Sequence, residues 1–193
     1  MHAKIIASAI AFILAAASAA PPAHARRSEV RAETVEAGAI PAEGLNIQWG
    51  RASTVIHTSK AELLTILHDY GQYAELFPQF RASRVLASRG DDALVYLEAR
   101  VAYDSFTLWG NLRISSKELS GARVIDARLK RGNVSHFQAE WTVRELPGGE
   151  ACEVVFKLLI DPDMKLPSSV ITKENVKAAR RAILALQRRV ASR

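Results

Sequence analysis

Hydrophobic and polar residues alternate with a period of two through most of the chain between residues 80 and 160. Such alternation is typical of β-strands that bury one face and expose the other. Short breaks, several of which contain glycine, divide this region into six predicted strands: 80–88, 93–103, 106–117, 122–131, 134–145 and 150–160. Because parallel neighbours need long crossover connections, the short breaks favour an antiparallel meander.

The region before these strands has a different pattern. Residues 47–57 are rich in β-branched and aromatic side chains, which predicts one earlier strand. Ser59 and Glu62 have the spacing of a capping box and predict the start of a helix that ends near Gly71. A second short helix is expected to end before Pro78, because the residue preceding a proline avoids the helical conformation.

A long helix is predicted after the last strand, from Pro167 to about residue 191. Its apolar side chains fall on one narrow stripe: Val176, Ala179, Ile183, Leu186 and Val190. Five of the six later strands carry apolar residues on one face only, so one layer is expected to cover the sheet. The order strand, two helices, six strands and long helix therefore predicts an α+β fold with about seven strands.

Residues 1–25 have the features of a secretory signal, namely a positive start, an apolar run and the cleavage pattern Ala23-His24-Ala25. An uncleaved anchor is the alternative, but the run Ile5–Ala20 is short for a bilayer. We therefore expect an exported protein, periplasmic if the source is bacterial. Residues 26–45 show no sustained period and are expected to form a flexible lead-in, which leaves 46–193 as one domain.

Composition narrows the classes of partner. The 193 residues are 49% hydrophobic and 24% charged, and the net charge is +6. This composition is too apolar for a disordered chain. Residues 166–193 hold seven Lys and Arg and one Glu, whereas residues 26–165 hold 18 Lys and Arg and 19 Asp and Glu. This distribution argues against a broad nucleic-acid footprint. We also expect the aromatic residues of the sheet to face the covered side, and no nucleic-acid partner.

The order of elements resembles the START-like (SRPBCC, helix-grip) superfamily, which includes the polyketide cyclase/dehydrase and coenzyme Q-binding START-domain proteins. The residues that carry the resemblance are Leu64, Asp69-Tyr70, Tyr73, Leu76-Phe77-Pro78, Trp141, Pro147 and Leu166-Pro167. The likeness spans roughly residues 47–191. It implies a curved antiparallel sheet that grips the C-terminal helix over an apolar cavity for lipids, quinones or polyketides.

The residues on the inward face suggest where such a cavity would lie. Small residues occur mid-strand in adjacent strands, with large aromatic residues around them. A row of small residues either admits a bulky helix or leaves a hole, and a solid core filled by the aromatics is the alternative. The resemblance favours the hole. The predicted cavity residues are Ala99, Tyr103, Phe106, Gly110, Ala127, Phe137, Ala139, Trp141, Phe156 and Ile183.

Candidates for chemistry are few. His57 and His136 lack the spacing of metal ligands, and His68 is predicted to be a cation at the negative end of a helix dipole. Cys152, the one cysteine, falls on the apolar face of its strand and is expected to be a buried, inert thiol. We predict no catalytic residue, no metal site and no cofactor.

The basic side of the last helix is a second candidate surface. We expect this side to be a solvated face; the alternative is a membrane-docking or partner surface, in which Arg188, Arg189 and Arg193 would touch lipid headgroups or the partner. The leading hypothesis is an exported carrier of a hydrophobic small molecule. The alternatives are a cyclase/dehydratase-type enzyme, which would need an inward-facing acid and base, and a module that blocks a macromolecular partner. The oligomeric state stays open.

Overall fold

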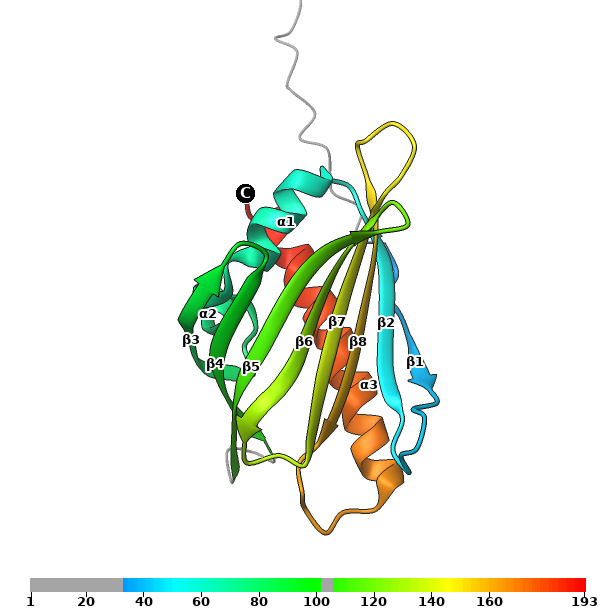
Figure 1. Cartoon of the computed structure of the whole chain (residues 1–193). Coiled ribbons are helices and arrows are strands. Elements are labelled where there is room, and N and C mark those ends of the chain that lie inside the picture. Colours follow the sequence, from blue (N-terminus) through cyan, green and yellow to red (C-terminus); the bar gives the residue numbers. More distant parts are fainter. Residues whose placement is uncertain (1–32, 102–105) are drawn as a thin grey trace, which may run out of the picture.

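The computed structural model describes residues 33–101 and 106–193. Within them the chain forms one antiparallel sheet of eight strands in the order β1-β2-β8-β7-β6-β5-β4-β3 (Figure 1). The strands are β1 (Glu36–Ile40), β2 (Trp49–Ile56), β3 (Phe80–Arg89), β4 (Asp92–Val101), β5 (Phe106–Leu119), β6 (Ala122–Gly132), β7 (His136–Glu145) and β8 (Cys152–Asp161). The sheet curves around a long C-terminal helix, so the predicted α+β, helix-grip class is confirmed.

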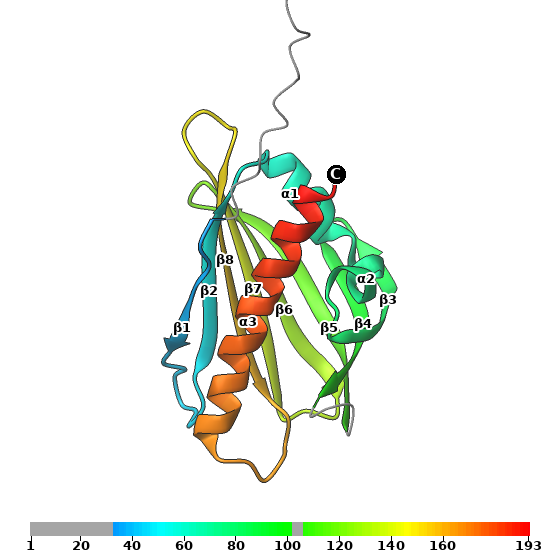
Figure 2. The same cartoon turned by 180° about the vertical axis from the view of Figure 1, so that it is seen from behind.

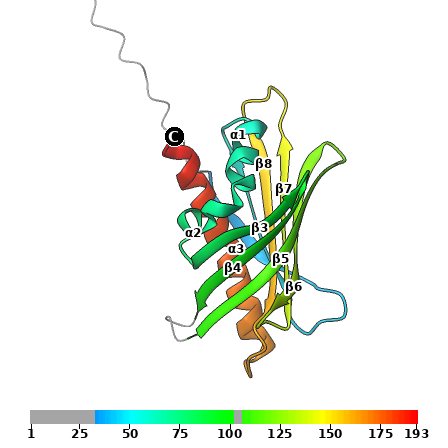
Figure 3. The same ribbon diagram turned by 60° about the vertical axis from the view of Figure 1, so that its left-hand side comes forward.

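The helices lie on one face of the sheet (Figure 2). They are α1 (Lys60–His68), the short 3-10 turn η1 (Tyr70–Gln72), α2 (Tyr73–Leu76) and α3 (Ser168–Ala191). The helix α3 crosses the sheet against β1, β2 and β8, and its C-terminal end reaches α1. Seen from the side, α1 and α2 cover one end of the same face (Figure 3). We call the covered face of the sheet the inner face and the opposite one the outer face.

Local sequence explains how the first helix starts. Ser59 is its N-cap, and the Ser59 hydroxyl accepts a hydrogen bond of 3.2 Å from the backbone N–H of Glu62. This bond satisfies one of the free amides of the first turn. The helix α1 ends at His68 with Asp69 as its C-cap, earlier than the predicted stop near Gly71, whereas the short α2 ends before Pro78 as the sequence predicts. The long helix also has its predicted bounds, with Pro167 as N-cap.

The connectivity confirms the meander and adds one strand. The strands from β3 to β8 pair in sequence order, and β2 joins the free side of β8. The strand β1 lies inside the segment 26–45, for which the sequence predicted a flexible lead-in, so the sheet has eight strands rather than about seven. Four of its five residues are exposed, and it is held by pairing with β2. A strand without a buried face has no apolar alternation, which is why the pattern missed it.

A close backbone contact fixes α3 on the sheet. A Cβ atom on Gly50 of β2 would lie 2.1 Å from the carbonyl oxygen of Asn175, so only glycine fits there. The Asn175 side chain is 4% exposed, and its amide nitrogen donates to the carbonyls of Gln48 and Ile160, each at 3.3 Å. Its amide oxygen accepts from the backbone N–H of Ile160 at 3.3 Å. Asn175 therefore ties α3 to β8 and to Gln48, the residue that precedes β2.

Candidate functional site

The inner face is tightly packed at the end next to α1. We call this part of the inner face the closed end. Its side chains are at most 2% exposed: Val95, Ile114, Ile125, Val143 and Val154. Each comes from a different strand between β4 and β8 and lies on the apolar face that the alternation predicts. Packing of this kind leaves no room for a ligand.

Exposure on the same strands rises toward the opposite end. Ala139, Phe156 and Leu158 are 7–8% exposed. The next inward-facing positions along the strands are partly exposed, and we call this part of the inner face the open end. Its apolar residues are Ala99, Leu108, Ala127, Leu129, Phe137 and Ile160. The gradient runs in the same direction on every strand from β4 to β8. The inner face is therefore sealed at one end and accessible at the other.

A row of contacting aromatic rings lies between the closed end and the open end. Phe77, which follows α2, stacks on Trp141 with ring centroids 6.1 Å apart. Trp141 in turn stacks on Phe156 at 4.1 Å. Phe77 also meets the edge of Tyr73 at 5.0 Å, and the Tyr73 hydroxyl donates to the carbonyl of Leu67 in α1. The rings join the α1–α2 segment to β7 and β8 and form the inner wall of the open end.

The structure brings several of the predicted cavity residues together. Ala127 lies directly opposite Ala139, and Trp141 lies opposite Phe156. Phe137 lies at the open end, whereas Ile183 of α3 is fully buried. Phe106, the first residue of β5, is 49% exposed. Tyr103 and the secretory segment lie outside the described residues.

One small residue leaves less room than its size suggests. The position of a Cβ atom on Gly110 lies 3.0 Å from a methyl carbon of Leu129, so the Leu129 side chain takes the space. The alternation places Leu129 on the inward face. The β5–β6 pairing has a register shift between Asn111 and Leu112, close to Gly110. The sequence pattern did not predict this shift.

Two of the titratable groups that the sequence singled out, His68 and Cys152, have structural partners. The His68 ring lies 3.0 Å from the Ser116 hydroxyl, and burial lowers the pKa of His68, with the charge of Arg123 adding to the effect and Asp91 opposing it. His68 lies in the last turn of α1 as predicted, but the direction of this shift favours the neutral ring over the predicted cation. Burial raises the pKa of the Cys152 thiol, which is fully buried as predicted.

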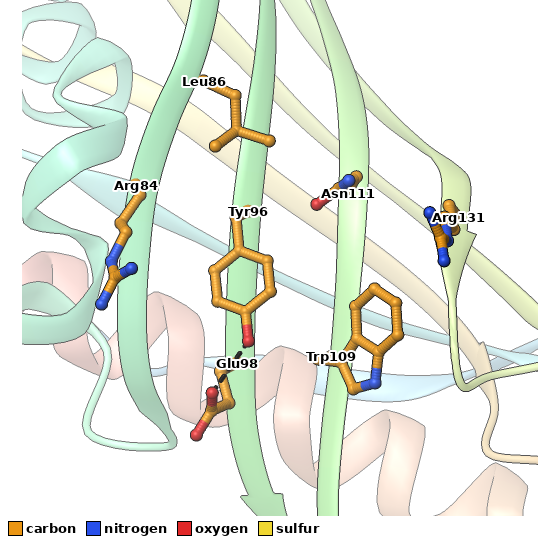
Figure 4. Close-up of a pocket in the computed structure, with 7 residues that line it drawn as sticks. All are labelled: Arg84, Leu86, Tyr96, Glu98, Trp109, Asn111 and Arg131. Carbon is orange, nitrogen blue, oxygen red and sulfur yellow. Dashed lines mark hydrogen bonds between the residues drawn. The ribbon is translucent and has the colours of Figure 1, made fainter.

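The outer face holds aromatic residues that the sequence placed wrongly. Tyr96 and Trp109 stand on the solvent side of β4 and β5, with ring centroids 6.3 Å apart, so the sheet aromatics do not all face the covered side. They line a shallow hollow of about 650 Å³ (Figure 4). The Tyr96 hydroxyl donates to Glu98 at 2.8 Å, and this hydrogen bond raises the pKa of Tyr96.

The chemistry available at the open end is that of apolar contact. Every inward-facing side chain that we assign to it, from Ala99 to Ile160, is a hydrocarbon or a phenyl ring. Burying such surface favours an apolar ligand by about 25 cal/mol per Å². In the described part of the chain, no group of His, Cys, Asp and Glu is arranged to hold a metal ion. None of the helices in that part is both long enough and apolar enough to span a membrane.

Comparison with known proteins gives the family. The family model described as polyketide cyclase / dehydrase and lipid transport matches residues 56–187. The chain belongs to this family, as the resemblance of its motifs implied. No curated protein matches the chain in sequence.

Solved structures share the fold at low sequence identity. A STAR-related lipid transfer protein from Xanthomonas axonopodis matches with a TM-score of 0.68 and 16% identity, over 83% of this chain and 95% of that one. Human StAR-related lipid transfer protein 5 gives 0.71 and 13%, over 82% of each chain. The Zhui aromatase/cyclase from a Streptomyces species gives 0.55 and 19%, over 72% and 88%. These likenesses establish the helix-grip fold of START domains.

Proposed function

We propose that this protein carries a hydrophobic small molecule, with a lipid or a quinone as the favoured classes, at the open end of its inner face. The observation that supports the proposal is the gradient of exposure along β4 to β8, which leaves apolar side chains accessible only at that end. The ligand would replace water over Ala127, Phe137 and Ile160 and rest against the aromatic wall of Trp141 and Phe156. The driving force is removal of apolar surface from water.

The proposed route for the ligand lies at the same end of the molecule. The helix α3 begins there, and β5 begins there as well (Figure 1). Three apolar side chains on these segments are strongly exposed, Phe106 at 49%, Leu166 at 43% and Val170 at 42%. Exposed apolar groups beside an apolar site lower the cost of transferring a ligand from a lipid phase. The first turns of α3 are the proposed gate.

A cyclase or dehydratase is the second candidate, because the family includes such enzymes and the Zhui aromatase/cyclase shares the fold. Guiding a condensation requires an acid and a base that face the substrate. The open-end side chains supply hydrocarbon surface instead. This contrast favours carriage over catalysis.

The proposal is tested by what the protein holds. We expect native mass spectrometry of the full chain, produced in its own host, to show an adduct that solvent extraction identifies as a lipid or quinone. Ala127→Trp places an indole at the open end and is expected to remove the adduct while the protein still folds. Arg128→Trp, on the outer face of the same strand, is the matched control and keeps it.

Three results would contradict the proposal. One is a bare mass after mild isolation together with no uptake from a lipid extract. The second is an adduct that Ala127→Trp retains at the wild-type level. The third is turnover of a polyketide-like substrate by the purified chain, which would favour the enzyme.

We propose further that the carrier works outside the cytoplasm, on the strength of the secretory pattern in residues 1–25. N-terminal sequencing of the exported protein is expected to find a start shortly after Ala25. Full-length chain in the cytoplasmic fraction would overturn this.

The basic residues Arg188 and Arg189 lie at the C-terminal end of α3, next to α1 and away from the proposed route. Contact of these residues and Arg193 with a membrane stays a prediction.

A further inference from the structure

The hollow on the outer face is built from a row of side chains that crosses four strands. Arg84 of β3 pairs with Tyr96 of β4, Tyr96 pairs with Asn111 of β5, and Asn111 pairs with Arg131 of β6. Neighbouring strands lie about 4.8 Å apart, so three spacings place the two arginines about 14 Å apart along the row. Figure 4 shows them at opposite sides of the hollow, with the rings of Tyr96 and Trp109 between them.

The centre of the hollow is a platform for stacking. The two rings are inclined by 30° and both are partly exposed to solvent. Aromatic rings of this size usually gain their stability by burial in the core. A pair that remains accessible on the outer face offers its flat surface to another planar group.

The charges at the two sides of the platform are uncompensated. Arg84 and Arg131 are exposed, and neither forms an ion pair or side-chain hydrogen bond with any residue of 33–101 or 106–193. Other cations on the same face are paired, such as Arg113 with Asp92, Arg128 with Asp126 and Lys157 with Glu140. Arg84 and Arg131 are therefore unpaired cations that flank the aromatic rings.

The one carboxylate in the hollow does not oppose an anionic ligand strongly. Glu98 accepts the hydrogen bond from Tyr96, and its other oxygen lies 3.4 Å from the guanidinium of Arg81. These two contacts offset its charge. The side-chain amide of Asn111 has no hydrogen-bond partner among the described residues and is free to bind a polar group.

We propose that this hollow binds a planar aromatic molecule that carries an anionic oxygen group, such as a carboxylate, sulfonate or phosphate, at each end. The rings of Tyr96 and Trp109 stack on its aromatic part, and the guanidinium groups of Arg84 and Arg131 bind the two anionic groups. Guanidinium groups match the geometry of such oxygen pairs.

The test is an NMR titration of the isotope-labelled full chain with a biphenyl dicarboxylate that carries its carboxylates at opposite para positions. We expect the largest shifts at the Trp109 indole N–H and at the amides of Tyr96 and Asn111. The dicarboxylate is expected to bind about three- to tenfold more tightly than the matching monocarboxylate, since each exposed charge pair contributes modestly.

Substitution of each arginine tests whether it binds one of the two anionic groups of the ligand. Arg84→Gln and Arg131→Gln are each expected to reduce the affinity for the dicarboxylate to that for the monocarboxylate. Arg128→Gln is the matched control, because it lies on the same strand and face as Arg131 but is already paired, and its affinity stays at the wild-type value. All three side chains are exposed, so the variants are expected to fold, and the dispersion of the amide spectrum checks this.

Several outcomes would overturn the inference. These are an absence of binding, equal affinity for the two acids, shifts confined to the inner face, or an affinity that neither arginine substitution changes. None of these outcomes bears on the proposed carrier function, because that proposal concerns the other face of the sheet.

Discussion

The two ends of the inner face follow the same alternation of apolar and polar residues but differ in how far they are covered. At the closed end, Val143 and Val154 are fully buried in a core cluster that includes Leu63 of α1 and Leu186 of α3. At the open end, Phe137 and Ile160, on the same two strands, remain partly exposed. The alternation decides which side chains point inward. The diagonal course of α3 over β1, β2 and β8 decides which of them are sealed.

The largest expected effect comes from moving the helix that makes this difference. Gly50→Ala places a methyl group 2.1 Å from the Asn175 carbonyl oxygen, so α3 or β2 must shift. We expect a loss of about 3 kcal/mol in the free energy of unfolding, measured by urea denaturation. Gly38→Ala in β1 is the matched control, since no atom lies within 4 Å of the added methyl group, and its effect stays within about 0.5 kcal/mol. Equal effects of the two substitutions would contradict the close contact.

A second pair of substitutions measures the difference between the two ends with one residue type. Ile114→Ala removes a 2% exposed side chain at the closed end and is expected to cost about 3 kcal/mol. Ile160→Ala removes a partly exposed side chain at the open end and is expected to cost about 1 kcal/mol, because less surface is buried there. Thermal or urea unfolding measures both. A larger loss for Ile160→Ala would show that the open end is packed like a core.

The smallest expected effect is a pH dependence of the free energy of unfolding, and it arises from His68 near the closed end. Because burial lowers the pKa of His68 in the folded state, the unfolded chain takes up a proton near pH 6.5 that the folded chain resists. The stability contributed by the neutral ring is present above that pH and is lost as the pH falls toward the lowered value. His68→Gln can keep the contact with Ser116 and is expected to flatten the dependence between neutral and mildly acidic pH. An unchanged pH profile in this variant would contradict the assignment.

Much of the fold was predictable because the signals that specify it are local. The period of two defined the strands from β3 to β8, Ser59 and Glu62 marked the start of α1, and Pro167 marked the start of α3. The strand β1 could not be predicted in this way, since its residues are exposed and only pairing with β2 defines it. The contact of Gly50 with Asn175 joins residues far apart in sequence, so no window of the chain contains it.

The candidate site was predictable only in outline. The alternation placed Ala127, Ala139, Trp141 and Phe156 on one face, but only the structure shows that Ala127 lies opposite Ala139 and Trp141 opposite Phe156. It could not show that Trp141 and Phe156 stack with Phe77 into a wall, which depends on where α2 docks. Nor could it show that Leu129 fills the space beside Gly110, which depends on how β5 and β6 pack together. Tyr96 could not be recognised in this way, because the alternation identifies the apolar face of a strand and Tyr96 lies on the opposite face.

The most direct test of the central claim is paramagnetic NMR with a spin-labelled fatty acid bound to the full chain. A nitroxide on the acyl chain broadens the amide signals of residues that lie close to it. If the ligand occupies the open end, the signals of Ala127, Phe137 and Ile160 are broadened while those of Val143 and Val154 keep their intensity. Equal broadening at both ends, or broadening confined to the outer face, would contradict the account.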